Sequence, residues 1–74
     1  MEGYYGPLYN IDYPNHDLAY YANMNAQGCM GLCDSYPDCI GFSHAHGSHC
    51  WIKNTNAFNS SNLRGLSGVN TYFK

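Results

Sequence analysis

The chain has 74 residues, a formal net charge of −2 and only 11% charged residues. A chain this short forms one domain, and it buries too little apolar surface to be comfortably stable without disulfides, a metal or a partner subunit. Three Lys and Arg residues are too few for the basic patch of a nucleic-acid-binding protein, and no apolar run could span a membrane.

Aromatic residues make up 16% of the chain, and eight of them are tyrosines. Tyrosine buries area at a low entropic cost while keeping a polar tip, so this composition suits an extracellular contact surface. The chain opens MEGYYGPLYN, without the basic and apolar runs of a secretory signal. If the protein is secreted, we expect its signal to have been removed.

The first part of the chain is expected to be extended. Residues 1–8 are rich in Tyr and Gly, and we expect them to precede a folded domain that spans residues 9–74. A short strand is expected over residues 8–11.

A turn should follow at residues 14–17, where Pro sets φ and Asn and Asp favour turn geometry. Asp12 and Asp17 look like turn-capping residues rather than a catalytic pair. Residues 18–21 are expected to form a second short strand.

A helix is predicted over residues 26–36, with Asn25 as its N-cap and Pro37 as its end. The spacing of three and four residues places one set of side chains on the same face of this helix: Ala26, Cys29, Leu32, Cys33 and Tyr36.

The remaining elements are strands joined by polar connections. Residues 39–43 alternate as a strand, residues 44–48 form a connection, and residues 50–53 begin the return strand. Residues 54–66 read as a long polar loop, and residues 69–73 as a final strand.

Four cysteines, Cys29, Cys33, Cys39 and Cys50, follow the spacing C-x3-C-x5-C-x10-C. Cys29 and Cys33 lie one turn apart on a helix, where their Cβ vectors run side by side, so a direct bond between them is disfavoured. Two connectivities remain. Chain reversal after Pro37 brings Cys39 towards Cys33 and favours the nested pairing, Cys29–Cys50 around Cys33–Cys39.

The strings IDYPNHDL, CMGLC, PDCIGF, CWIK and GVNTYFK resemble a PAN/apple domain over residues 9–74. CWIK and the cysteine spacing before it are the most specific part. The resemblance implies an α+β fold, in which an antiparallel sheet of about five strands cradles a single helix, with the same nested disulfides. The outer disulfide that joins the termini of apple domains is missing, so this is the four-cysteine PAN type.

PAN domains are extracellular modules that bind proteins or carbohydrates, so the resemblance implies a secreted, non-catalytic module that recognises carbohydrate or glycoprotein. The alternative is a self-associating subunit of an extracellular filament or matrix, because low charge gives little self-repulsion and the tyrosines could dock on a neighbour. The candidate ligand contacts are Tyr20, Tyr21, His44, His46 and Lys53. Trp51 is expected in the core, near the Cys29–Cys50 bridge.

Two further kinds of site are weaker hypotheses. His44, His46, His49 and Cys50 offer zinc-type ligands, but their spacing matches no common zinc pattern and Cys50 has a better use in a disulfide. No G-x-S-x-G or H-E-x-x-H motif surrounds the serines and histidines, so no enzyme activity and no cofactor are expected. Asn59 begins the only N-x-S/T sequon and is a candidate glycosylation site.

Overall fold

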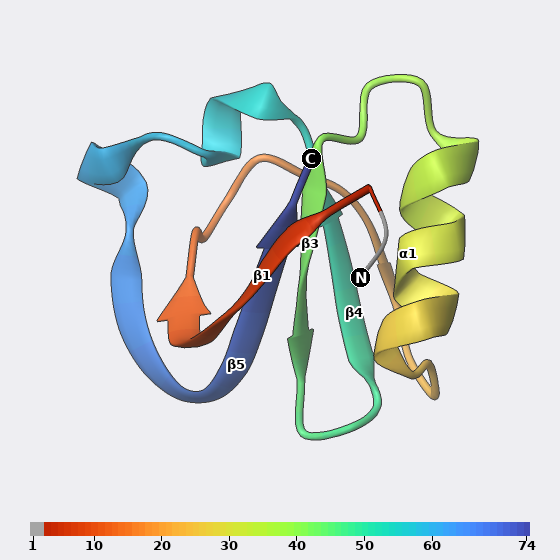
Figure 1. The fold of residues 1–74 in the computed structure, drawn as a ribbon, viewed down its shortest axis with the longest axis horizontal. Coiled ribbons are helices and arrows are strands. Elements are labelled where there is room, and N and C mark those ends of the chain that lie inside the picture. The colour runs from red at the N-terminus through yellow and green to blue at the C-terminus, as the bar shows by residue number, and fades with distance from the viewer. Residues whose placement is uncertain (1–2) are drawn as a thin grey trace.

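One α-helix packs against a five-stranded antiparallel sheet in this computed structural model, which describes residues 3–74 (Figure 1). The elements in chain order are β1 (Tyr5–Asp12), β2 (Asp17–Tyr21), α1 (Ala26–Ser35), β3 (Gly41–Ala45), β4 (His49–Lys53), the 3-10 turns η1 (Thr55–Ala57) and η2 (Ser60–Asn62), and β5 (Arg64–Phe73). The strand order is β1-β5-β3-β4-β2. The small α+β fold expected from the sequence is therefore confirmed. None of the helices in this described part is long and apolar enough to cross a membrane.

Helix α1 begins and ends where local chemistry requires it. The Asn25 side chain accepts a hydrogen bond from the backbone N–H of Gly28 at 2.7 Å, which satisfies one of the free donors of the first turn. Tyr36 is extended, with φ −103° and ψ 117°, because the residue before a proline is driven out of the helical region. The helix therefore stops at Ser35, one residue before the expected end.

Two disulfides tie this helix to the sheet and to its own exit. Cys29 is bonded to Cys50 of β4, and Cys33 is bonded to Cys39, which is the nested arrangement described above. Both helix cysteines are completely buried. Two glycines weaken the helix by about 1 kcal/mol each relative to alanine, so these covalent ties do much to maintain it.

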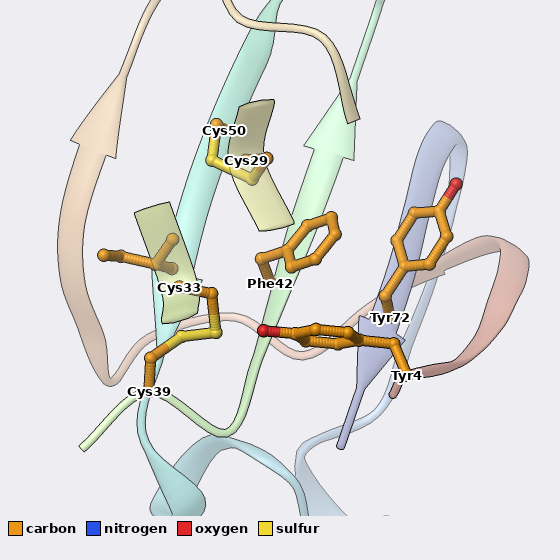
Figure 2. Close-up of a cluster of buried hydrophobic side chains, with 8 residues drawn as sticks. Tyr4, Cys29, Cys33, Cys39, Phe42, Cys50 and Tyr72 are labelled. Atoms are coloured by element: carbon orange, nitrogen blue, oxygen red, sulfur yellow. A yellow bond between two sulfur atoms is a disulfide. The ribbon is translucent and has the colours of Figure 1, made fainter. Parts of the chain in front are cut away.

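The hydrophobic core lies between α1 and the sheet. Phe42 of β3 stands between the two disulfides on one side and the rings of Tyr4 and Tyr72 on the other (Figure 2). Its ring stacks on Tyr72 with centroids 4.8 Å apart and meets Tyr4 edge-on at 5.5 Å. Ile52 of β4 is also fully buried here. Sulfur and aromatic groups thus supply most of the core of a domain that is too small for many aliphatic side chains.

The ends of several elements differ from expectation. The expected domain boundary between residues 8 and 9 falls inside β1, because Tyr5 and Leu8 already pair with β5. Residues 5–8 are therefore part of the sheet, while residues 1 and 2 lie outside the described residues. The long polar loop is also shorter than expected, since β5 already begins at Arg64.

The two-stranded ribbon of β1 and β5 is sharply bent. Asn10 has φ +57° and Gly68 has φ +85°, and the pairing register shifts beside Asn10. The Asn10 side chain accepts a hydrogen bond from the Gly68 backbone N–H at 3.0 Å, which joins the two irregular points. The curve of β5 is visible in Figure 1.

The two ends of the described chain meet beside α1. The Lys74 ammonium lies 5.6 Å from the centre of the Tyr4 ring and 3.6 Å from the Asp34 carboxylate. The Tyr4 hydroxyl donates to the same carboxylate at 2.7 Å. These contacts hold the start of the sheet, the last residue and the helix at one place.

Candidate functional site

Strand alternation divides the sheet into two chemically different faces. Cys50 and Ile52 of β4 point towards α1 and are buried there. Trp51 and Lys53, which alternate with them, therefore point to the opposite side. We call this side the helix-free face, and its side chains form the candidate site.

Three aromatic rings form a row on the helix-free face: Tyr20, His49 and Trp51. Tyr20 of β2 is the cross-strand partner of Trp51, and their ring centroids are 5.3 Å apart. His49 lies 5.8 Å from Trp51 and stacks on Tyr20 at the same separation. The Tyr20 hydroxyl and His49 Nδ1 are 2.6 Å apart, which fixes both rings. Tyr20 remains 48% exposed, so this row presents an aromatic surface to solvent.

A hollow of about 250 Å³ adjoins the aromatic row, and Trp51 belongs to both. The sheet contributes Lys53 and Val69, the connection from β1 to β2 lines one side, and the bent start of β5 contributes Leu66. The full set of lining residues is Asp12, Pro14, Asn15, Asp17, Trp51, Lys53, Leu66 and Val69.

Three charged groups line this hollow. The Lys53 ammonium donates to Asp17 Oδ1 in an ion pair, and the Lys53 side chain is only 2% exposed while that of Asp17 is 36% exposed. Asp12 Oδ1 accepts from the Ser43 hydroxyl at 2.8 Å and from the Tyr13 backbone N–H at 2.8 Å. Two carboxylates against one ammonium leave the hollow with a net negative charge.

Buried hydroxyl groups hold the Asp12 wall of the hollow in place. Ser43 and Thr71 are completely buried, and their hydroxyl oxygens are 2.8 Å apart. Thr71 Oγ1 also donates to the Ile11 carbonyl at 2.7 Å. Each of these polar groups has a partner, so their burial carries no penalty for unmade hydrogen bonds. The network fixes β1 over the sheet and thereby fixes the Asp12 carboxylate at the hollow.

The five candidate ligand contacts do not share one surface. Tyr20 and Lys53 lie on the helix-free face, although Lys53 is buried in its ion pair. The Tyr21 hydroxyl lies 2.6 Å from that of Tyr36, beside the helix. His46 is exposed at the tip of the β3–β4 hairpin.

His44 departs most clearly from the sequence analysis, which placed it in the connection over residues 44–48 and among the candidate ligand contacts. Strand β3 continues to Ala45, so His44 lies within the sheet and is only 9% exposed. Its Nε2 is 2.6 Å from the Met24 carbonyl oxygen, which gives the ring a structural partner. Cys50 is held in a disulfide, so the suggested zinc ligand set of three histidines and this thiolate does not form.

Trp51, Asp12 and Asp17 are the site residues that sequence reasoning placed elsewhere. Trp51 was expected beside the Cys29–Cys50 bridge, and the structure puts it on the opposite face. The alternation of strand residues carried the correct signal, because a buried Cys50 requires its neighbour to point the other way. The Asp12 carboxylate accepts a hydrogen bond from the backbone N–H of the next residue, Tyr13, and it also lines the hollow.

Tyrosines of the helix side are held in their neutral form. Burial raises the pKa of Tyr4, and its contact with the Asp34 carboxylate raises that pKa further. Burial also raises the pKa of Tyr72. The hydrogen bond with Tyr36 raises the pKa of Tyr21. These hydroxyls therefore serve the packing of the helix side.

Asn59 is exposed and precedes the short turn η2. Its Oδ1 accepts hydrogen bonds from the backbone N–H of Ser61, at 3.0 Å, and from the Ser61 hydroxyl. The sequon is thus on the surface, in the connection between β4 and β5.

Comparison with known families gives a match over most of the chain. Residues 3–60 fit the family model described as a PAN-like domain. The comparisons with curated proteins and with solved structures give no match.

Proposed function

The chain belongs to the PAN-like domain family, and we propose that it is an extracellular, non-catalytic module that binds carbohydrate, either free or on a glycoprotein. PAN domains are in general modules that bind proteins or carbohydrates rather than enzymes. The choice of carbohydrate, rather than protein alone, as the ligand rests on the side chains of the helix-free face.

The observation that carries this proposal is the junction of the aromatic row with the hollow. A sugar ring has an apolar face of C–H groups and a rim of hydroxyls. The exposed ring of Tyr20 and the partly buried ring of Trp51 suit the apolar face, and the polar groups of the hollow suit the hydroxyls. Concave sites of this kind combine apolar walls with a few placed polar groups.

Secretion is supported by the cysteine chemistry. Two disulfides tie the single α-helix to β4 and to its own exit, and disulfides persist in oxidising compartments such as the extracellular space. The low charge and the exposed tyrosines are consistent with such a surface.

A glycan array probed with the oxidised protein tests the proposal. We expect retention on a subset of glycans, and we expect Tyr20→Ala to weaken it about tenfold, as the loss of one aromatic contact does. Tyr9→Ala is the matched control, because Tyr9 is also an exposed tyrosine, at 69%, but does not belong to the aromatic row. Absence of retention on every glycan, with the disulfides intact, would refute the proposal.

Self-association into a filament or matrix is the second candidate function. Tyr5 and Tyr9 are each 69% exposed on β1, which is an edge strand of the sheet. Edge strands offer unpaired backbone groups to a neighbour. Size-exclusion chromatography and electron microscopy of the purified protein test this candidate. Concentration-dependent polymers that disappear in a Tyr5→Ala/Tyr9→Ala variant would favour it, whereas a monomer at all concentrations would exclude it.

Glycosylation of Asn59 is a further part of the proposal. The side chain is exposed and the required Ser61 is beside it. Expression through a eukaryotic secretory pathway should give a glycosidase-sensitive mass increase that is lost in Asn59→Gln. An unmodified secreted protein would show that the sequon is not used.

A further inference from the structure

The hollow beside Trp51 has the size of a single-ring site. Its volume of about 250 Å³ lies below the range of roughly 300–1,000 Å³ that is typical of drug-sized ligands. Trp51 and Leu66 provide apolar lining, and Lys53 and Val69 come from the sheet beneath. Because Trp51 also belongs to the aromatic row, a ring in the hollow leaves Tyr20 free for the next ring of a chain.

The polar groups of the hollow offer both hydrogen-bond donors and acceptors. An ammonium has three donor positions, and within residues 3–74 the Lys53 ammonium uses one of them, for Asp17. Hydrogen bonds within the same residues reach Oδ1 of Asp12 and of Asp17, which leaves the second oxygen of each carboxylate as an acceptor. Hydroxyl groups both donate and accept, so they match this mixture better than a purely anionic or purely cationic ligand does.

The net charge of the hollow bears on the kind of sugar that it could hold. Lys53 is neutralised by Asp17, while Asp12 is held by the Ser43 hydroxyl and the Tyr13 N–H, which are uncharged partners. Lys74 lies on the other side of the sheet, beside Tyr4 and Asp34. Arg64 lies opposite Asp12 in the sheet, but its guanidinium donates to the Leu63 carbonyl and does not line the hollow. A carboxylate or sulfate on the sugar would therefore meet a site of like charge.

We propose that the hollow binds the terminal ring of a neutral, hydroxyl-rich glycan and rejects uronic, sialylated or sulfated sugars. Asp12 is the residue that sets this selectivity, because its carboxylate accepts from sugar hydroxyls and repels acidic groups. This inference rests on the proposed carbohydrate binding and adds the class of sugar.

The test uses methyl glycosides of glucose, galactose and mannose, each paired with the corresponding C6-uronate, so that the members of a pair differ in one charged group. Titrations followed by two-dimensional ¹H–¹⁵N NMR should show neutral glycosides shifting the Trp51 indole resonance. Uronates should bind about fivefold more weakly or worse, which is the effect of one like-charge contact at roughly 4 Å in a water-exposed setting.

The Asp12→Asn variant removes the negative charge of this side chain while keeping its size, so it tests the charge alone. The amide retains an acceptor oxygen for Ser43, so the wall should stay in place, and the spread of amide resonances reports whether the fold is kept. We expect weaker binding of the neutral glycoside and a loss of most of the discrimination within each pair. Asp38→Asn is the matched control: it makes the same charge change at an exposed position outside the hollow and should leave both quantities unchanged.

Different results would refute the sugar selectivity and the carbohydrate binding itself. Uronates that bind as well as neutral glycosides, or an array that retains only sialylated or sulfated glycans, would overturn the selectivity and leave carbohydrate binding standing. Neutral glycosides that shift helix-side resonances instead of Trp51 would overturn the location. Absence of any response, on the array and in the titrations, would refute carbohydrate binding itself.

Discussion

The two faces of the five-stranded sheet differ in the side chains that they carry and in what covers them. The face towards α1 is closed by two disulfides and by stacked aromatic rings around Phe42, and most of its side chains are apolar. The helix-free face buries Ser43, Thr71 and Lys53, which are polar, and leaves a charged hollow open to solvent. The helix side therefore carries the stability of the domain, and the helix-free face is available for recognition.

Removal of a disulfide should give the largest effect and acts on the helix side. The Cys29–Cys50 bridge spans 21 residues and the Cys33–Cys39 bridge spans 6. On the chain-entropy model, the Cys29→Ala/Cys50→Ala variant should lose about 3 kcal/mol of unfolding free energy and the Cys33→Ala/Cys39→Ala variant about 2 kcal/mol. Urea denaturation measures both losses. A larger loss from the short bridge would mean that the helix exit, not the α1–β4 tie, maintains the core.

The ion pair of the helix-free face should respond asymmetrically to substitution. Asp17→Asn leaves a nearly fully buried ammonium without its carboxylate and should cost about 1–3 kcal/mol of unfolding free energy. Lys53→Met keeps the volume of the stem, and the Asp17 carboxylate that remains can be solvated because it is 36% exposed. We expect that variant to stay within about 1 kcal/mol of the parent chain.

Urea denaturation of both variants measures this asymmetry. Equal losses would show that Lys53 contributes through its charge rather than through its apolar stem.

The bend of the β1–β5 ribbon should be sensitive at Gly68. An added Cβ would lie 3.0 Å from His46 Cε1, and a residue with a side chain is strained at φ +85°. Gly68→Ala should therefore cost about 1–2 kcal/mol of unfolding free energy. Gly65→Ala is the control, since no atom lies within 4 Å of its added Cβ and Gly65 also belongs to β5.

Thermal and urea denaturation compare these two glycine variants. NMR shifts of residues that line the hollow report whether its Leu66 wall has moved. If both variants behaved alike, the bend would not depend on the positive φ of Gly68.

Alkaline pH should act selectively on the helix side. The pKa values of Tyr4 and Tyr72 are raised by burial, so above the ordinary tyrosine pKa of about 10 the unfolded chain loses protons that the folded chain retains. The contribution of these two hydroxyls to the free energy of unfolding is complete below that pKa, and the free energy of unfolding falls as the pH rises above it.

The urea midpoint should therefore stay nearly constant from about pH 8 until the pH approaches about 10 and should decrease above that pH, and Tyr72→Phe should reduce the decrease. Tyr5→Phe removes a hydroxyl from an exposed ring and should follow the parent chain. An unchanged midpoint in the parent chain would show that these hydroxyls are not protected by folding.

The helix side was largely predictable from the sequence. The cysteine spacing, the Asn25 cap and the stop before Pro37 are local signals, and each acts within a few residues of the element it defines. The resemblance to PAN domains then supplied the sheet. Errors of a few residues at the strand ends arose because Ala45 and Arg64 join strands through long-range pairing, which no local pattern shows.

The hollow was not predictable in the same way. It depends on a bend that joins Asn10 to Gly68 across 58 positions of the chain, and on the burial of Ser43 beneath Asp12. Composition does not encode such contacts. Trp51 is different, because its face followed from the burial of Cys50 by strand alternation alone.

The contact between Lys74 and Tyr4 has a consequence for how this domain can be joined to other polypeptides. Tyr4, near the start of the described residues, and Lys74, the last residue, meet at one corner beside Asp34 of α1, and the aromatic row and hollow lie on the opposite side of the sheet. A host protein could therefore carry the domain as an insertion in a surface loop, with little separation required between the two junctions. Inserted in this way, the domain would have both junctions near α1, and the aromatic row and the hollow would face away from the host protein.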